Sequence, residues 1–334
     1  MRHMISTADW SRSEIETLLS HAQQLKQEPI QPLLKNKNIG LLFFNPSMRT
    51  RSSFQLGTQQ MGGHFVVLSP GKDAWPIEFN DHEMMDGDPE EHIAEVAKVL
   101  SRYCDLLAVR AFPKFQDWRE DRQDKVIHAF AKYATVPVIN METITHPCQE
   151  LALALTLKEK WGQTDKKNFL LTWTYHPKPL NTAVANSGLI IAAKMGMNVK
   201  LLIPDERYRL DDRYMDLAAS YCADNSASFD VTTDIEEGYK DANMVYAKSW
   251  GALPFFGNWE AEKPIRDANK HFIVNEEKMA LTDNAFFSHC LPVRRNIKVT
   301  DGVLDSDAAI HIDEAENRLH VQKALMATLI KNHS

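Results

Sequence analysis

Short runs of apolar residues alternate along the chain with longer segments in which apolar residues recur at helical spacing. The short runs suit strands buried on both faces, and the longer segments suit amphipathic helices. Strands are predicted at 41–44, 64–69, 105–109, 136–141, 168–175, 198–204, 228–233, 244–249 and 285–289. Helices are predicted at 11–27, after Ser47, and at 90–101, 121–133, 147–161, 182–195, 211–223 and 316–329. The alternation predicts an α/β protein.

A polar stretch from Gly162 to Lys167 interrupts this pattern, which then restarts. At 334 residues the chain is long for a single hydrophobic core, so two domains of about 150 residues each are expected. We therefore predict two doubly wound parallel-sheet domains, with ligands at the carboxyl ends of the strands.

The stretch from Leu41 to Arg51 carries the clearest chemical signal. Asn45-Pro46 ends the strand, and Ser47 is a natural N-cap for the helix that follows. Arg49 and Arg51 in the first turn oppose the helix dipole, which is unfavourable unless an anion compensates them. This pattern predicts a bound phosphate at the helix N-terminus. In the alternative interpretation, the two arginines are solvated or pair with carboxylates elsewhere.

A polar segment from Pro70 to Pro89 has little periodicity and is predicted to be a functional loop or a subunit contact. Trp75 lies inside it and is either a local plug or an anchor that reaches a neighbouring site. Glu90 follows at the predicted start of a helix, where a carboxylate is favourable.

Polar side chains gather where the predicted strands end, and arginines there suit a phosphate because the guanidinium offers paired donors in one plane. The set favours group transfer from a phosphorylated donor, with His146 the best candidate to stabilise developing negative charge on a carbonyl oxygen. Arg318, near the predicted start of the last helix, is either a surface residue or a further anion ligand. The strand-end set is Ser47, Arg49, Thr50, Arg110, His146, Gln149, Lys248, His289 and Arg294.

Composition excludes several classes of function. The net charge of −7, with no basic block, argues against nucleic-acid binding. Four scattered cysteines indicate neither a disulfide framework nor a zinc site, and a reducing compartment such as the cytoplasm fits. No apolar run is long enough to suggest membrane insertion. Because GxGxxG and P-loop patterns are missing, neither a dinucleotide cofactor nor a Walker NTPase is expected, and we predict no cofactor and no metal.

Three motifs resemble the signatures of the aspartate and ornithine carbamoyltransferase superfamily, in the expected order: Ser47-Met-Arg-Thr-Arg51, His146-Pro-Cys-Gln149 and His289-Cys-Leu-Pro292. Met48 stands where ornithine and aspartate enzymes usually have threonine, and the stretch from Lys248 to Gly257 replaces the usual loop of the ornithine enzymes. The chain is more similar to the N-acetylornithine carbamoyltransferases, through Trp75-Pro-Ile-Glu78, Asn140-Met-Glu-Thr143 and Tyr175-His-Pro-Lys-Pro-Leu180.

The resemblance implies that carbamoyl is transferred from carbamoyl phosphate to the δ-amine of N-acetylornithine, giving acetylcitrulline and phosphate in arginine biosynthesis. It implies a carbamoyl-phosphate domain at 1–147, an acetylornithine domain at 148–313, and a C-terminal helix at 314–334 that returns to the first domain. It also implies a chain knotted around the proline-containing loop, and a homotrimer with active sites between subunits, Trp75 entering from a neighbour.

The resemblance also implies roles for residues. Arg110, His146 and Thr50 would polarise the carbamoyl oxygen, Glu142, Lys248 and Leu291 would hold acetylornithine, and Glu90 would repel the longer, anionic succinyl substrate. Lys298 resembles a lysine that the family can carry carboxylated. The residues implied to hold carbamoyl phosphate are Ser47, Met48, Arg49, Thr50, Trp75, Arg110, His146, Pro147, Cys148, Gln149, Cys290, Leu291 and Arg318.

Three other functions stay open at this point. Ornithine or N-succinylornithine carbamoyltransfer is the nearest alternative. A dehydrogenase on a doubly wound scaffold is disfavoured by the missing fingerprint, and a phosphate-sensing protein without activity would not need the charged groups that chemistry requires.

Overall fold

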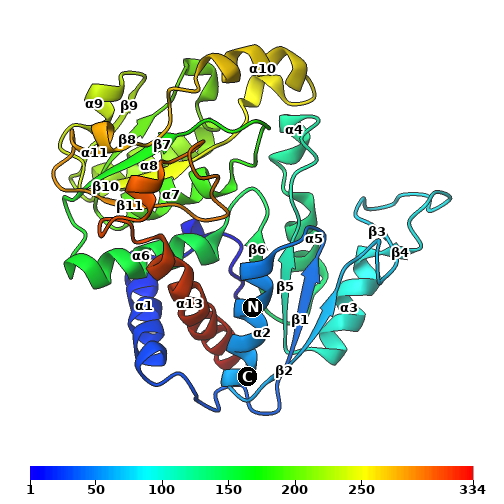
Figure 1. Cartoon of the computed structure of the whole chain (residues 1–334). Helices are drawn as coiled ribbons and strands as arrows, with labels where there is room; N and C mark the ends of the chain where they lie inside the picture. The colour runs from blue at the N-terminus through cyan, green and yellow to red at the C-terminus, as the bar shows by residue number, and fades with distance from the viewer. Residues whose placement is uncertain (334) are drawn as a thin grey trace. The chain divides into compact units, whose positions relative to one another are not determined.

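A computed structural model describes residues 1–333, and the chain divides into two compact units. The first unit comprises Met1–Pro113, Glu120–Leu151 and the segment from Asn317 onward, and the second comprises Lys114–Arg119 and Ala152–Glu316. Three helices, α4, α6 and α13, each contain a boundary between the units. Each unit is built on its own parallel sheet, as predicted (Figure 1).

The sheet of the first unit has the strand order β2-β1-β5-β6, and every neighbouring pair is parallel. Leucine and valine side chains on three of these strands pack against α3 and α5 to form one apolar core. The strands are β1 (Asn38–Phe43), β2 (His64–Leu68), β5 (Leu106–Arg110) and β6 (Val138–Glu142). The helices are α1 (Arg12–Gln27), α2 (Met48–Gln60), α3 (Ile93–Tyr103), α4 (Trp118–Asp121), α5 (Lys125–Tyr133), α6 (Pro147–Trp161) and α13 (His311–Lys331), with a short 3-10 helix η1 (Thr7–Asp9).

Local sequence signals explain where the first helices begin and end. The predicted capping box of α1 is present, since Ser11 accepts from the Glu14 amide and the Glu14 carboxylate accepts from the Ser11 amide at 2.8 Å. Ser47 caps α2 as predicted, and Gly62 follows the end of that helix at φ 75°, a conformation that glycine adopts without strain.

The predicted helix 121–133 is wrong as a single element, because the chain breaks into α4 and α5. Asp124 separates them in the left-handed conformation, at φ 51°. Its carboxylate accepts a hydrogen bond from the Thr143 hydroxyl at 2.5 Å, and Thr143 lies in the turn that precedes α6. A contact between residues distant in sequence therefore overrides the helical periodicity.

The segment 70–89 is not wholly irregular. A short parallel pair, β3 (Ile77–Glu78) and β4 (Glu91–His92), closes the base of a loop that extends from the first unit (Figure 1). The following helix, α3, begins at Ile93 with His92 as its N-cap. The prediction that Glu90 begins a helix is therefore wrong, because strand pairing continues through residue 92.

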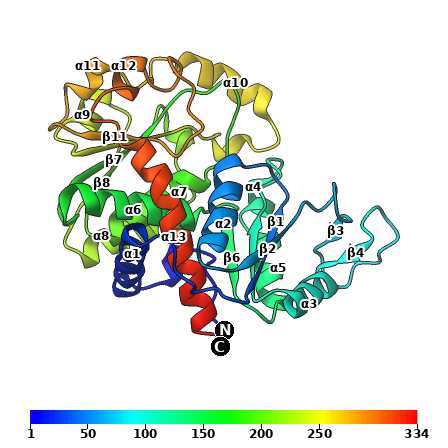
Figure 2. The same cartoon turned by 60° about the horizontal axis from the view of Figure 1, so that its bottom comes forward.

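The last helix is longer than predicted and starts at His311. Arg318 consequently lies about two turns inside α13 rather than near its start, so the helix-dipole argument for an anion at Arg318 is wrong. Within the first unit, α13 runs beside α1 and α2 in both views (Figures 1 and 2). The fully buried Lys323 fixes this packing by donating to Leu25 O at 3.1 Å and to Gln60 Oε1 at 3.0 Å.

The second unit has a five-stranded parallel sheet in the order β11-β10-β7-β8-β9. The helix α7 is buried along its whole length, which explains its nearly unbroken apolar sequence. The strands are β7 (Asn168–Trp173), β8 (Asn198–Leu202), β9 (Phe229–Thr232), β10 (Met244–Lys248) and β11 (Phe286–Ser288). The helices are α7 (Ala183–Lys194), α8 (Asp212–Asp224), α9 (Ile235–Tyr239), α10 (Trp259–Ala268), α11 (Glu276–Met279) and α12 (Asp301–Leu304), with 3-10 helices η2 (Glu206–Tyr208) and η3 (Leu253–Phe255).

Candidate active site

The N-terminus of α2 is the first element of the candidate site. Ser47 Oγ accepts from the amide of Thr50 at 3.2 Å, which fixes the first turn of the helix. Thr50 is buried at 1% exposure, while Met48 beside it is 75% exposed. The helix has no acidic residue in its first turn, so the dipole and Arg49 together leave positive potential at this end.

Arg318 joins three helices of the first unit. Its guanidinium donates to Thr50 Oγ1 on α2 at 2.8 Å and to Gln149 Oε1 on α6 at 2.6 Å. Burial lowers the pKa of Arg318, and the positive charges of Arg110 and Arg49 act in the same direction. Since an arginine stays protonated in proteins, Arg318 remains a buried cation whose two hydrogen bonds hold Thr50 and Gln149 beside it.

A β-bulge places Arg110 opposite a carboxylate. The register of β5 against β6 shifts between Val109 and Arg110, so that Arg110 lies opposite Glu142 and forms a salt bridge with it. Bulges beside active sites often redirect a side chain in this way. The Arg110 guanidinium also lies over the Phe112 ring, with its carbon 4.5 Å from the ring centroid. Its buried Nε has no hydrogen-bond partner within residues 1–333, which leaves a donor for an oxyanion.

His146 lies at the turn that leads into α6, and it is 3% exposed. Its Nε2 is 3.4 Å from Glu142 Oε2, so the Glu142 carboxylate faces both His146 and Arg110. The turn itself is held by Asn140, whose amide donates to Thr143 Oγ1 at 2.9 Å and to Thr145 Oγ1 at 3.1 Å. Arg110 and His146 can therefore each offer an N–H donor to the same oxygen atom.

The cysteine in the motif is not a nucleophile. Cys148 is fully buried on α6, and burial raises the pKa of its thiol to about 12. The thiol therefore stays protonated near neutral pH, whereas nucleophilic cysteines need a thiolate. Pro147 and Cys148 shape the start of α6, and Gln149 is the motif residue that contacts Arg318.

The extended loop carries two further predicted residues. Trp75 is 64% exposed and precedes β3, and the exposed Glu90 lies directly before β4. Neither contacts the Arg110 and Arg318 cluster in any interaction described for residues 1–333.

In the second unit, the predicted amine-site residues lie at and beyond the carboxyl ends of β10 and β11. Lys248 is 7% exposed and its Nζ donates to Ser249 O at 3.0 Å. Lys298 is 1% exposed, and its Nζ lies 3.3 Å from His289 Nε2. Burial, together with repulsion from Lys248 and Arg294, lowers the pKa of Lys298 to about 7.

The tautomer of His289 agrees with a neutral lysine. His289 Nδ1 accepts from the Leu291 amide at 2.9 Å, so in the neutral ring the proton lies on Nε2, which faces Lys298. An uncharged Lys298 amine can accept that proton in a hydrogen bond, whereas an ammonium group cannot.

Leu291, which follows the half-buried Cys290, adopts an unusual backbone conformation with φ 56°. Left-handed conformations of residues other than glycine, asparagine and aspartate persist only where the surroundings enforce them, and they often lie at ligand sites. Leu291 is followed by a cis peptide bond to Pro292.

The sequence patterns predict no role for His176, which lies in the proline-containing stretch from Tyr175 to Leu180. Burial lowers the pKa of His176 to about 4, with further contributions from Lys298, Arg294 and Lys248. His176 is therefore neutral near pH 7 and lies near the cations of this cluster. The signal that could have located it is its position just after β7, at the ligand-binding edge of the sheet.

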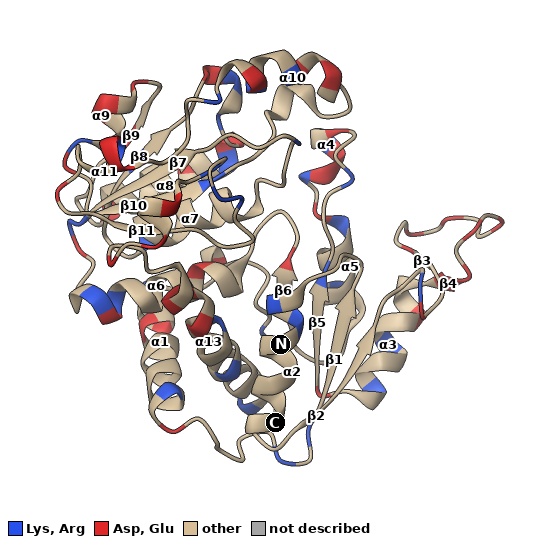
Figure 3. Ribbon diagram, in the orientation of Figure 1, with Lys and Arg blue, Asp and Glu red and all other residues tan. Residues whose placement is uncertain are grey.

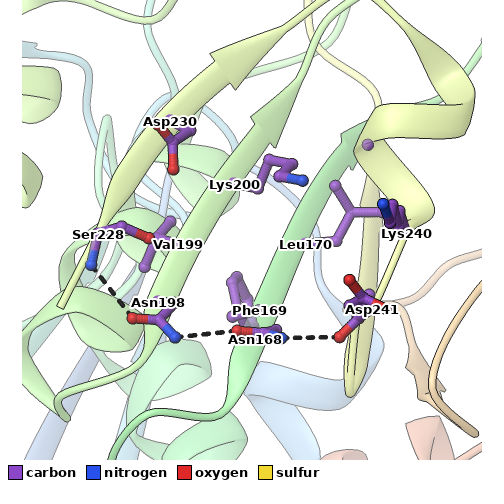
Figure 4. A pocket seen from close by; sticks show the side chains of 12 residues that line it. Asn168, Phe169, Leu170, Asn198, Val199, Lys200, Ser228, Asp230, Lys240 and Asp241 are labelled. Atoms are coloured by element: carbon purple, nitrogen blue, oxygen red, sulfur yellow. Dashed lines mark hydrogen bonds between the residues drawn. The ribbon is translucent and has the colours of Figure 1, made fainter.

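The pocket in Figure 4 lies at the opposite, amino-terminal edge of this sheet and has a volume of 190 Å³. Its amide side chains bond to one another and to the backbone: Asn198 donates to Asn168 at 2.9 Å, and Asn168 donates to Asp241 O at 2.8 Å. Because its polar groups are satisfied locally and it lies away from the carboxyl ends, this pocket is not our candidate active site.

Basic and acidic positions are interspersed over both units rather than gathered on one basic face (Figure 3). Within residues 1–333, no helix is long and apolar enough to cross a membrane, and no group of three or more His, Cys, Asp or Glu side chains is placed to hold a metal ion.

Comparison with known proteins identifies the family. Residues 2–159 match the family described as aspartate/ornithine carbamoyltransferase, carbamoyl-P binding domain, and residues 179–329 match its Asp/Orn binding domain. The chain belongs to the aspartate/ornithine carbamoyltransferase family. This confirms the resemblance seen in the three motifs, and the two parallel-sheet units agree with the predicted fold class.

Within this carbamoyltransferase family, the chain is 64% identical over 332 residues to the N-acetylornithine carbamoyltransferase of Xanthomonas campestris pv. campestris, covering 99% of this chain and 98% of that protein. A solved acetylornithine transcarbamylase in complex with acetylcitrulline is 64% identical, with a TM-score of 0.98 over 98% of this chain and 99% of that one. A variant of N-acetyl-L-ornithine transcarbamylase with a glutamate replaced by alanine, complexed with carbamyl phosphate and N-succinyl-L-norvaline, has the same identity and TM-score over 98% and 100% of the two chains.

Proposed function

We propose that this chain transfers the carbamoyl group of carbamoyl phosphate to the δ-amine of N2-acetyl-L-ornithine, giving N-acetylcitrulline and phosphate in arginine biosynthesis. The observation that carries the proposal is 64% identity along nearly the whole chain to a protein named N-acetylornithine carbamoyltransferase. The clusters around Arg110 and Arg318 support it, because they supply the donors that the chemistry needs.

In the first unit, the phosphate would bind at the N-terminus of α2, with Ser47, Met48, Arg49 and Thr50, and Arg318 would secure Thr50 and Gln149 beside it. Arg110, Thr50 and His146 would donate to the carbamoyl oxygen. Pro147, Cys148 and Trp75, and from the second unit Cys290 and Leu291, complete the proposed carbamoyl-phosphate residues. Donors aimed at an oxygen that gains negative charge lower the barrier most.

The δ-amine would attack the carbonyl carbon, forming the new carbon–nitrogen bond while the carbonyl oxygen takes up negative charge. The tetrahedral intermediate then collapses, the bond to the phosphate oxygen breaks, and phosphate leaves with the electron pair. An alkyl amine is protonated near neutral pH, so one proton must leave before attack, and a second leaves the nitrogen afterwards. The departing phosphate can accept a proton.

Glu142, Lys248 and Leu291 would hold acetylornithine. Glu142 faces Arg110 and His146, where a carboxylate can also orient the attacking amine. Lys248 would pair with the substrate carboxylate, and Arg294 adds positive charge to its surroundings. Lys298 is a proposed site of carboxylation, because a neutral amine is the form that reacts with carbon dioxide.

Glu90 would select the acyl group, because its carboxylate repels the second carboxylate of a succinyl substrate. A related transcarbamylase whose glutamate is replaced by alanine is described with N-succinyl-L-norvaline bound, which supports such a role.

We further propose a cytoplasmic homotrimer in which the exposed Trp75 reaches a neighbouring site.

A product assay tests the function directly. The purified protein is incubated with carbamoyl phosphate and, separately, with acetylornithine, ornithine or succinylornithine, and the carbamoylated product is identified by mass spectrometry. We expect acetylcitrulline to form fastest. Citrulline as the main product would identify an ornithine enzyme instead, and no product with any amine would refute carbamoyltransfer to this class of substrate.

A further inference from the structure

One side chain, that of His92, forms hydrogen bonds at the base of the loop that carries Glu90. We propose that His92 is a positioning residue for acyl-group selectivity: its imidazole fixes the loop 80–90 and thereby the position of Glu90. The inference rests on the proposed function, since it concerns how that reaction selects acetylornithine over succinylornithine.

The two ring nitrogens of His92 act on different segments. Nδ1 accepts from the Ala94 amide at 3.2 Å and so caps α3. Because Nδ1 is an acceptor, the proton of the neutral ring lies on Nε2, which is 3.2 Å from Asn80 O and donates to it. A single imidazole therefore joins the helix, the end of the loop and its beginning.

The strands on either side of the loop are anchored separately. Glu78 pairs with His92 in the register of β3 and β4, and the Glu78 carboxylate accepts from the amides of Phe79 at 2.8 Å and Asn80 at 2.6 Å. Phe79 packs on the apolar core of the first unit, with its ring centroid 5.8 Å from that of Phe44 and 6.2 Å from that of Phe130. These contacts place Asn80 firmly, so the bond from His92 is made to a fixed point.

A second set of contacts holds Asp81, the residue after Asn80. Asp81 accepts from the Tyr133 hydroxyl at 2.5 Å and from Lys132 Nζ at 2.6 Å, both on α5. The Tyr133 ring also contacts His92, at 6.3 Å between centroids. Lys132 and Asp81 are half exposed, and exposed ion pairs contribute little to stability. Asp81 thus reinforces the position that His92 sets, and both act on the loop rather than on the substrate.

Trp75 follows a separate turn, formed by residues 69–74. The amide of Gly71 donates to Ala74 O at 2.8 Å, and Ser69 N donates to the Asp73 carboxylate. Loss of the His92 bond should therefore disturb Glu90 more than Trp75, and affect selection of the amine more than binding of carbamoyl phosphate.

Two substitutions separate the roles of the ring nitrogens. His92→Asn keeps an acceptor near Nδ1 and hence the helix cap, but its side chain is too short to reach Asn80 O. His92→Gln places an amide nitrogen near Nε2 and keeps the bond to Asn80, but caps the helix poorly. The readout is the ratio of kcat/KM for acetylornithine to kcat/KM for succinylornithine in the assembled protein, with the oligomeric mass checked by light scattering.

We expect His92→Asn to reduce this ratio on the order of 10-fold, the effect of one lost hydrogen bond, with an unchanged Kd for carbamoyl phosphate and a nearly unchanged Tm. His92→Gln should keep the ratio within about 2-fold while lowering Tm. If His92 serves only to cap α3, His92→Gln should lower both the kcat/KM ratio and Tm more than His92→Asn does. That result would overturn the proposal.

A double-mutant cycle is the second test of the role of His92. In a Glu90→Ala protein, adding His92→Asn should change the ratio less than about 2-fold, because the side chain being positioned is already gone. A full and additive effect there would also overturn the proposal. His82→Asn, at an exposed position of the same loop with φ 62°, is the matched control and should leave the ratio unchanged.

The outcomes also distinguish this inference from the proposed function. If the wild-type protein forms no acetylcitrulline, the proposed function fails. If it forms acetylcitrulline selectively and Glu90→Ala relaxes that selectivity while His92→Asn does not, only the role of His92 is refuted.

Should His92→Asn fail to fold, a second variant tests the proposal. Tyr133→Phe removes only the hydroxyl that holds Asp81 and should reduce the ratio about 2-fold. An unchanged ratio would refute the proposal.

Discussion

The candidate-site residues of the two units differ in how their positive charges are compensated. In the first, each guanidinium has an acceptor: Arg110 pairs with Glu142, and Arg318 donates to Thr50 and Gln149. In the second, the cations Lys248, Arg294 and Lys298 repel one another, and the Lys298 amine has a pKa of about 7. The first cluster is a set of fixed donors, whereas the second can change its protonation state near neutral pH.

This difference matches the chemistry proposed for each unit. A phosphate and a developing oxyanion are stabilised best by donors that are already oriented and need no reorganisation during the reaction. A carboxylate-bearing amine substrate arrives with its own negative charge, which can compensate a cluster that is otherwise short of acceptors.

The largest effect is expected at Arg110. Arg110→Ala removes an oxyanion donor and should lower kcat by about 10² to 10³. Arg110→Lys restores the charge but not the planar pair of donors, and should recover only part of the loss. Steady-state kinetics measures both, with Arg102→Ala on the exposed face of α3 as the control. Near-normal turnover in Arg110→Ala would exclude Arg110 from the catalytic step.

A smaller effect, mainly on binding, is expected at Arg318. Arg318→Gln leaves the Thr50 hydroxyl and the Gln149 amide without their shared donor, so the Kd for carbamoyl phosphate should rise about 10- to 100-fold. Isothermal titration calorimetry measures this Kd. An unchanged Kd would mean that the three-helix bridge serves only the packing of α13.

In the second unit, Lys248→Met should raise the KM for acetylornithine by about 10-fold and leave the Kd for carbamoyl phosphate unchanged, because only the carboxylate of the amine substrate loses a partner. Lys240→Met is an exposed control in the same unit. If the Kd for carbamoyl phosphate rises instead and the KM does not, the assignment of Lys248 to the amine is wrong.

Much of this site follows from local sequence patterns. Ser47, with Arg49 and Thr50 behind it, predicts a capped helix with an anion site because capping depends only on adjacent residues. The strand order and the register could not be predicted in this way. The pairing of Arg110 with Glu142 depends on a bulge between Val109 and Arg110, and no local pattern marked that bulge.

Helical periodicity predicts a helix that begins at Glu90, one that runs through Asp124 and one that begins shortly before Arg318. In the structure, strand pairing continues through residue 92, Asp124 bonds to Thr143 between two helices, and α13 begins at His311. Periodicity locates an element, but tertiary contacts decide where it begins and ends.

The titration of Lys298 tests this contrast most directly. An exposed lysine has a pKa near 10.5, and that of Lys298 in the folded chain is about 7. Between these values the unfolded chain binds a proton that the folded chain does not, so the free energy of unfolding should rise with pH by at most about 1.4 kcal/mol per pH unit.

Urea unfolding at pH 7.5 and 9.5 in buffer depleted of carbon dioxide should therefore show wild-type protein gaining stability relative to Lys298→Met as the pH rises. Added bicarbonate should weaken this dependence and add the mass of one carbon dioxide, because a carbamate on Lys298 is an anion that Lys248 and Arg294 stabilise. Equal pH dependence of wild type and Lys298→Met would show that Lys298 stays charged, and the second cluster would then hold three fixed cations with no titrating member.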